Sequence, residues 1–441
     1  MKLFIRATFL LAITAFIGEC VEFIINMILA KELGEKGLGL YMSILPTIFL
    51  VVVLASLELP ISVSKLIAEK DEKYHRNILS QVTKFAILST ISFLVIAMIV
   101  LPIVPVFDAY HPYVKWLVLI LIPIASFSSI ARGFFMGTHA MGKIAVSNFL
   151  RRALQLLLLV FVFQLLEFST DMAIILALCA LVASEIGVFG YLIIEYLIKL
   201  RTLNGKSRSQ LSSKSVRESL LSVSVPTTGL RIFHSLTHAV QPFLIKAALM
   251  KAGLSADIAM EQFGLVAGVA LTIGFFPAFI AHSLLIVLIP TVSKAYAQKD
   301  FTLLQSLLRK VMHFTFIYGV PAVLAFYFFS KPLTRLFFDS DDATIYLQML
   351  WPYFLFHFFV IPMQAYLIGL GLVKDAFYHQ IWTTIISFSM MFVFGSLPQL
   401  QMDGIIVGMN MGAVLLMLLH YVTICKKIGV SFFVMNPIKE G

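Results

Sequence analysis

Long apolar stretches, separated by short polar connections, occur along the whole sequence. A helix of about 20 apolar residues is long enough to cross a bilayer. Because lipid offers no hydrogen-bonding partners, the backbone groups of such a stretch must bond to one another. Sixty per cent of the 441 residues are hydrophobic and 13% are charged, which a soluble core cannot absorb. The stretches are too long for barrel strands, so we predict an all-α polytopic membrane protein.

Twelve of these stretches are predicted to be transmembrane helices. Lys2 and Arg6 precede the first one as in a signal peptide, but no small-residue cleavage site follows, so this stretch is expected to be retained. The longest polar connection, 200–219, has the composition of a flexible basic linker. It separates two predicted six-helix bundles, residues 1–199 and 220–441. The predicted spans are 5–30, 38–59, 82–105, 113–135, 144–166, 172–198, 222–250, 262–290, 311–330, 345–370, 376–397 and 404–425.

Lys and Arg residues are distributed unevenly between alternate connections. If the N-terminus faces the cytoplasm, the inner segments hold most of the 33 Lys and Arg residues. Such an asymmetry predicts that both termini are cytoplasmic, and the expected location is the cell membrane. The net charge of +10 is spread over short loops and not over one basic face, so no nucleic-acid partner is predicted.

No cofactor or catalytic motif is apparent. Cys20, Cys179 and Cys425 lie in different apolar segments and match no metal or disulfide spacing. The Gly-Lys-Ser at 205–207 lacks the glycine that a phosphate-binding loop requires five residues earlier, so no ATPase is predicted. Any energy source is therefore expected to be a proton gradient, a sodium gradient or the membrane potential.

An internal repeat relates the two predicted bundles. VSKLIAEKD at 63–71 aligns with VSKAYAQKD at 292–300, and the similarity continues to residues 85 and 314. An even number of crossings separates the copies, so both halves enter the membrane from the same side. They are predicted to be parallel repeats related by a pseudo-two-fold axis along the membrane normal, with a ligand site where the bundles meet.

Polar residues form a stripe in the seventh predicted span. Arg231, His234, His238 and Gln241 fall on one helix face. A charged residue at mid-membrane costs roughly 2.5–3.5 kcal/mol on insertion scales. A water-filled cavity, a carboxylate on a neighbouring helix or an anionic ligand can offset that cost. We therefore predict that this helix forms one wall of a polar, ligand-binding cavity.

The first predicted span has a similar stripe, formed by Glu19, Glu22 and Asn26. If helices one and seven are equivalent, the stripes face each other, and Glu19 or Glu22 is a candidate counter-charge for Arg231. The alternative is a static ion pair that orients two helices. Glu58, at the inner end of the second span, and His282, in the eighth, are further candidates for the cavity lining.

Other charged residues have simpler interpretations. Arg132, Arg151 and Arg152 lie near inner ends of spans, where arginines are expected to reach lipid headgroups. Glu185 lies near mid-span and is a weaker candidate for ligand contact. The acidic sequence 339–342 contains an Asp-x-Asp, which in a glycosyltransferase holds a metal-bound sugar nucleotide. Because this loop is predicted to be outside, a solvated acidic turn is the preferred interpretation.

Several segments resemble the polysaccharide-export and stage V sporulation protein B-like branch of the MATE-like flippases, in the MOP superfamily. They are LPISVSKLIAEKD (59–71), FPAFIAHSLLIVLIPTVSKAYAQKD (276–300), ARGFFMGTHAMGKIAVSNFLRRALQ (131–155) and SVPTTGLRIFHSLTHAVQPFLI (224–245). The branch often has fourteen helices, whereas twelve are predicted here. Lys143 and the Arg151/Arg152 pair also depart from the residues usual in the fifth helix.

The resemblance implies a non-enzymatic flippase that moves a polyprenyl-diphosphate-linked saccharide across the membrane, a cell-envelope or spore-envelope precursor, by alternating access. The expected partners are the lipid-linked saccharide and membrane lipids, while the oligomeric state is left open. One alternative is a cation-coupled multidrug exporter of the same fold, with Glu19 and Glu22 as ion ligands. Alternatives of other classes are a membrane glycan polymerase or transferase and a non-transporting scaffold.

Overall fold

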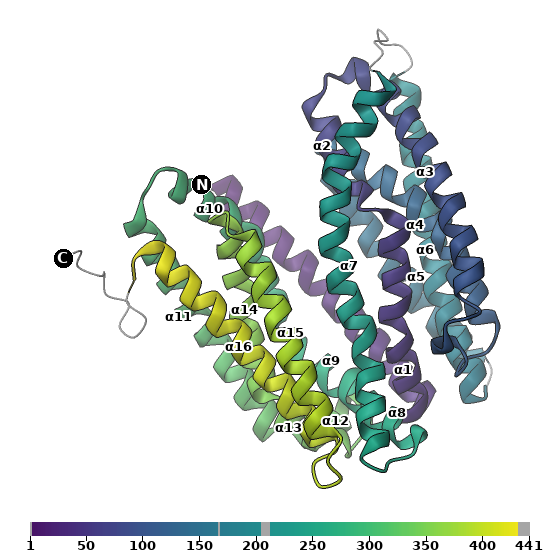
Figure 1. Cartoon of the computed structure of the whole chain (residues 1–441), viewed down its shortest axis with the longest axis vertical. Helices are drawn as coiled ribbons and strands as arrows, with labels where there is room; N and C mark the ends of the chain where they lie inside the picture. The colour runs from purple at the N-terminus through teal and green to yellow at the C-terminus, as the bar shows by residue number, and fades with distance from the viewer. Residues whose placement is uncertain (1, 166–167, 204–211, 431–441) are drawn as a thin grey trace. The chain divides into compact units, whose positions relative to one another are not determined.

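The structure is a computed structural model that describes residues 2–165, 168–203 and 212–430, and it consists of helices joined by short turns (Figure 1). The helices are α1 (Lys2–Ser56), α2 (Leu59–Glu69), α3 (Glu72–Val100), the 3₁₀-helix η1 (Pro105–Phe107), α4 (Tyr113–Gly137), α5 (Met141–Leu165), α6 (Thr170–Leu203), α7 (Ser213–Lys251), α8 (Ala256–Gly264), the π-helix η2 (Leu265–Ala270), α9 (Leu271–Phe275), α10 (Ala278–Ala297), α11 (Phe301–Phe328), α12 (Ser330–Phe338), α13 (Ala343–Met349), α14 (Trp351–Gly369), α15 (Val373–Gly395) and α16 (Met402–Ile428).

The predicted all-helical membrane fold is confirmed. Ten helices among the described residues are long and apolar enough to cross a membrane. One of them, Phe16–Glu69, contains both of the first two predicted spans, and the eighth predicted span corresponds to two, Ala256–Phe275 and Ala278–Ala297. Residues 204–211 of the predicted linker lie outside the described residues, and α6 and α7 include residues on either side of them.

Two compact units can be distinguished, unit I (residues 40–240) and unit II (residues 1–39 and 241–441). The boundaries between them lie inside α1 and α7, so each of these helices contributes to both units. This division by contacts differs from the predicted division at 200–219, because the first 39 residues pack with the C-terminal half. The division into two six-helix bundles, 1–199 and 220–441, stays a prediction.

Unit I depends on close packing between α2 and α4. A Cβ added at Gly133 would lie 2.7 Å from the Cβ of Val63, and one added at Gly137 would lie 2.7 Å from the Cβ of Ile67. No larger residue permits this approach, so the two glycines allow α2 to lie directly on α4. The same packing positions the residues of α4 that line the cavity described below.

Unit II contains an equivalent contact. Val292 of α10, which aligns with Val63 in the repeat, lies against Gly369 of α14, where an added Cβ would be 2.7 Å from the valine Cβ. The two copies of the repeat therefore use the same valine in the same kind of helix contact. This agreement supports the interpretation of the repeat as a duplication.

The helical path is broken in unit I between α1 and α2. Leu57 and Glu58 have φ angles of 47° and 48°. The left-handed region costs an L-residue about 1–2 kcal/mol. The hydroxyl of Ser224 in α7 donates a hydrogen bond to the Leu57 carbonyl, and Glu58 pairs with a second residue of α7. The two contacts with α7 hold the strained break in place.

A smaller backbone strain in unit II gives the first testable prediction. Lys299, after α10, is exposed and has a φ of 55°, whereas its repeat equivalent Lys70 has an extended φ of −115°. Replacing Lys299 with glycine should raise the free energy of unfolding by about 1 kcal/mol, since glycine adopts the left-handed region without strain. Thermal unfolding in detergent measures this. Lys70→Gly is the matched control and should not raise the free energy of unfolding. Equal effects of the two changes would contradict the assignment of backbone strain to Lys299.

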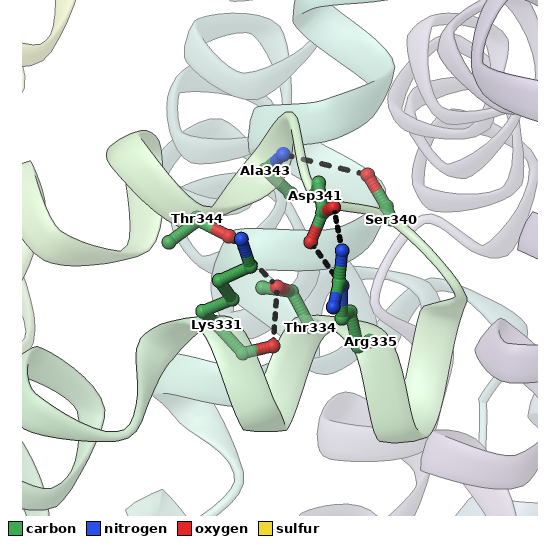
Figure 2. A network of polar contacts seen from close by, with 7 residues as sticks. All are labelled: Lys331, Thr334, Arg335, Ser340, Asp341, Ala343 and Thr344. Atoms are coloured by element: carbon green, nitrogen blue, oxygen red, sulfur yellow. Dashed lines mark hydrogen bonds and ion pairs between the residues drawn. The ribbon is translucent and has the colours of Figure 1, made fainter.

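The acidic loop joins α12 to α13 and is tied to an arginine (Figure 2). Arg335 donates from Nε to Asp341 Oδ1 at 2.5 Å, and its Nη2 bonds to the same carboxylate. These hydrogen bonds hold the pKa of Asp341 below its usual range. Thr334 and Thr344 share a hydrogen bond of 3.0 Å beside this pair (Figure 2). Asp339, Asp341 and Asp342 are exposed, as expected of a solvated turn.

Candidate functional site

Unit I contains a cavity of about 510 Å³ among its helices. Its walls come from the end of α1, the α1–α2 break, α2, α4, α5, α6 and α7. The apolar part of the wall includes Val52, Val53 and Leu121. Its polar part contains three arginines, two carboxylates, an amide and several hydroxyls; these are Ser56, Glu58, Ser128, Ser129, Arg132, Asn148, Arg151, Glu185 and Arg231.

Arg231 of α7 pairs with Glu58 at the α1–α2 break. Its Nε lies 3.1 Å from Glu58 Oε1. The glutamate side chain is 6% exposed, whereas the arginine side chain is 61% exposed. Glu58 is thus buried against the protein while the guanidinium remains open on the cavity side. Glu19 and Glu22 are the predicted candidates for the counter-charge, but Glu58, predicted only as part of the lining, is the residue that pairs with Arg231.

The other two arginines have looser partners. Arg132 of α4 donates from Nη1 to Asn148 Oδ1 of α5 at 2.9 Å. Arg151 of α5 lies with its Nε 3.8 Å from Glu185 Oε1 of α6, which is longer than a hydrogen bond. Both arginines were predicted to reach lipid headgroups, which stays a prediction; the structure shows in addition that they line the cavity. Each keeps donors that a ligand in the cavity can bind.

A hydroxyl group adds a further donor. Among the described residues, Ser128 Oγ of α4 is buried and has no hydrogen-bonding partner, although Ser128 lines the cavity. Burying an unpaired hydroxyl is unfavourable. Three guanidinium groups face only two carboxylates here, so the cavity has the charge and the donors to bind an anion with several oxygens. Arginine forks match phosphate geometry particularly well.

The stripe of the first helix lies in unit II. Glu19, Glu22 and Asn26 together line a smaller cavity of about 150 Å³, with Thr272, Phe275 and other residues. Asn26 Nδ2 donates to Thr272 Oγ1 at 3.4 Å. The prediction that these three polar residues share one face is confirmed. The prediction that this stripe faces that of the seventh helix stays a prediction.

The remaining candidates lie outside both cavity linings. His234 and His238 are exposed neighbours on α7, with ring centroids 4.6 Å apart. Gln241 is half-buried at the start of the α7 segment that belongs to unit II, and His282 is exposed on α10. The structure therefore brings Arg231 and Glu58 together.

Solved structures with the same fold confirm the architecture. The chain resembles a structure described as the inward-facing conformation of a multidrug resistance MATE family transporter of the MOP superfamily. The TM-score is 0.74, with 15% sequence identity, over 95% of this chain and 98% of that one. The chain is therefore a multi-pass membrane protein with the MATE fold.

Sequence comparisons define the family. Residues 4–253 match the family described as polysaccharide biosynthesis protein, and residues 265–386 match the MatE family. The chain belongs to the polysaccharide biosynthesis protein family, within the MOP superfamily of flippases and transporters, and is not an enzyme. It is 52% identical to the sporulation protein YkvU of Bacillus subtilis (strain 168), over 98% of this chain and 97% of that protein.

Two more distant relatives come from the same organism. Stage V sporulation protein B is 29% identical, over 97% of this chain and 85% of that protein. The lipid II flippase MurJ is 24% identical, over 51% of this chain and 42% of that protein. The resemblance to the stage V sporulation protein B-like branch is thus confirmed.

Proposed function

We propose that this chain is a flippase that moves a polyprenyl-diphosphate-linked saccharide across the cell membrane. The observation that carries the proposal is the gathering of Arg132, Arg151 and Arg231 around one cavity inside a membrane-spanning unit. Placing an isolated arginine in a membrane costs free energy. Three arginines around one cavity therefore indicate a binding site for an anionic ligand. The names of the relatives, a polysaccharide biosynthesis family and a lipid II flippase, favour a lipid-linked saccharide as that ligand.

The ion pairs of the cavity are the exchangeable part of the site. The diphosphate displaces Glu58 from Arg231 and Glu185 from Arg151, so the guanidinium groups exchange carboxylate oxygens for phosphate oxygens. Ser128 donates its unpaired hydroxyl to the same group. A cavity of about 510 Å³ falls within the usual range for small-molecule sites, about 300–1,000 Å³. The prenyl tail remains in lipid during the transfer.

The direction of transport is proposed to be from the inner to the outer leaflet, with both termini in the cytoplasm. The asymmetry of Lys and Arg between connections supports this orientation. The driving force is a proton or sodium gradient or the membrane potential, which acts with about 2.3 kcal/mol per charge per 100 mV.

A second candidate function is the export of organic cations. The cavity of Glu19, Glu22 and Asn26, with the aromatic ring of Phe275 in its wall, favours a positively charged ligand. The similar solved structure is described as a multidrug resistance transporter. The two candidates place the ligand in different units and on residues of opposite charge, so one experiment separates them.

The experiment uses the purified chain reconstituted into vesicles. One set contains a fluorescent polyprenyl-diphosphate saccharide, a second the corresponding monophosphate lipid, and a third a fluorescent organic cation. We expect fast transfer of the diphosphate lipid between leaflets, slower transfer of the monophosphate lipid and no accumulation of the cation. Cation transport without lipid transfer would overturn the proposal in favour of the exporter.

Neighbouring arginines of α5 provide a matched pair of variants. Arg151→Gln should slow the transfer of the diphosphate lipid by about tenfold, since a charge-assisted hydrogen bond contributes about 1.5–3 kcal/mol. Arg152 is the next residue and lies outside the described lining of the cavity, so Arg152→Gln should keep most of the activity. Equal losses in both variants would mean that general basic charge, and not the cavity, is required.

A further inference from the structure

Two histidines of unit II contact each other at the interface of α15 and α16. His379 Nδ1 lies 3.0 Å from His420 Nδ1. Thr423 Oγ1 lies 3.2 Å from the other ring nitrogen of His379, Nε2. His420 is 2% exposed, and His379 is half-buried. Neither histidine belongs to the cavity in unit I.

Close packing of α15 against α16 fixes the distance between the rings. Glycines at 404, 408 and 412 recur every four residues and form one face of α16. A Cβ added at Gly408 would lie 2.6 Å from the backbone nitrogen of Met391, and one added at Gly412 would lie 2.8 Å from Ser387 Cβ. His420 continues this face two turns beyond Gly412, and His379 lies two turns before Ser387. Figure 1 shows the two helices side by side.

The hydrogen bonds restrict the tautomers of the neutral pair. An Nδ1–Nδ1 hydrogen bond needs one ring to donate and the other to accept. If Thr423 donates its hydroxyl to His379 Nε2, then His379 carries its proton on Nδ1 and donates it to His420. His420 then carries its own proton on Nε2. The neutral arrangement thus satisfies every nitrogen of His379, as tautomers are inferred from such networks.

One additional proton fits into this arrangement. A proton from water forms an N–H bond at His379 Nε2, and the Thr423 hydroxyl turns from donating to accepting. His379 is then an imidazolium that donates to Thr423 and to His420. A second proton would place two cations within contact distance, at rings that the glycine face prevents from separating. The geometry therefore has room for one proton and not two.

Several ionisable groups lie on the turns around the two histidines. Asp375 lies one turn before His379 on α15. Tyr366 of α14, which packs against α16, donates its hydroxyl to the Leu304 carbonyl. The other charged or ionisable groups on nearby turns of these helices are Lys374, Tyr421, Cys425, Lys426 and Lys427.

We propose that His379 and His420 form a binding site for one proton between α15 and α16. Neither the family nor the relatives' names assign a role to these residues. Because Thr423 lies on α16 and His379 on α15, proton binding reverses the direction of one hydrogen bond between the two helices. The link to transport rests on the proposed function: the bound proton is one that a proton-coupled flippase can use.

The test is nitrogen NMR of the full chain in lipid vesicles, labelled with ¹⁵N in its histidines. His379→Gln and His420→Gln assign the two sets of signals. We expect opposite tautomers at pH 8, a coupling between the two Nδ1 atoms through their hydrogen bond, and uptake of one proton per pair, on His379, as the pH falls. His313→Gln, at an exposed position on α11, is the control and should leave these signals unchanged.

Three results would overturn the proton site: both rings taking up protons in the same pH range, both staying neutral down to pH 4, or no coupling between the Nδ1 atoms. A second measurement rests on the proposed function. Lipid transfer should vary with pH in the wild type and in His313→Gln but not in His379→Gln. Absence of lipid transfer in the wild type would contradict the proposed flippase. The NMR result does not depend on lipid transfer and tests the proton site by itself.

Discussion

Replacing Arg231 with alanine is expected to reduce transfer of the diphosphate lipid by at least about 100-fold, because two charge-assisted hydrogen bonds of about 1.5–3 kcal/mol each are lost. The arginine presents its guanidinium to the cavity, while Glu58 holds it from the protein side. The measurement is the rate of lipid transfer in vesicles that contain equal amounts of inserted protein.

Loss of stability must be separated from loss of transport in this variant. Removing Arg231 leaves the Glu58 carboxylate buried without its partner, although solvent around the exposed guanidinium limits the effect to about 1 kcal/mol. The double variant Arg231→Ala, Glu58→Gln removes that buried charge and should recover wild-type thermal stability without recovering transfer. Wild-type rates of lipid transfer in either variant would contradict the proposed contact between Arg231 and the diphosphate.

Replacing Gly39 with alanine is expected to destabilise unit II by about 3 kcal/mol. A Cβ at this position would lie 1.8 Å from the Met260 carbonyl oxygen and 3.2 Å from the backbone nitrogen of Gly264. Because these are backbone atoms of α8 and not flexible side chains, α1 and α8 must separate, and overpacking of this kind costs about 1–3 kcal/mol or more. Thermal unfolding of the purified protein measures the loss.

A glycine in open surroundings is the control for this change. An added Cβ at Gly190 of α6 meets no atom within 4 Å, so Gly190→Ala should stabilise the helix by about 0.5–1 kcal/mol. If Gly39→Ala were as stable as Gly190→Ala, the contact of α1 with α8 would be wrong, and with it the assignment of residues 1–39 to unit II.

The helices could be predicted from sequence because each span has its own local signal, about 20 apolar residues. The break between α1 and α2 could not be predicted from sequence. Leu57 and Glu58 carry no glycine or other signal for a left-handed backbone, and the contacts that hold them come from Ser224 and Arg231 on a helix far along the chain. Local propensity does not contain such a tertiary constraint.

The candidate site was predicted in part, because helical periodicity tells which residues share a face but not which helix that face meets. It identified Arg231 as a charge that needs a partner, and grouped Glu19 with Glu22 and Asn26. It could not assign Glu58 to Arg231, since that pairing depends on how α7 packs in unit I.

The two missed arginines had a signal that was available. Asn148 and Arg151 fall on one face of α5, and Ser128 and Arg132 on one face of α4. Because α5 begins at Met141, Arg151 lies nearly three turns inside the helix and deeper than the predicted start of the span suggested. Polar stripes in these helices, read together with the stripe of helix seven, point to a shared cavity.

The most direct test is the structure of the full chain bound to a polyprenyl-diphosphate saccharide. We expect diphosphate oxygens within hydrogen-bonding distance of the guanidinium groups of Arg231 and Arg132, with the Glu58 carboxylate displaced from Arg231. A diphosphate bound elsewhere, with the 3.1 Å ion pair between Arg231 and Glu58 intact, would contradict it.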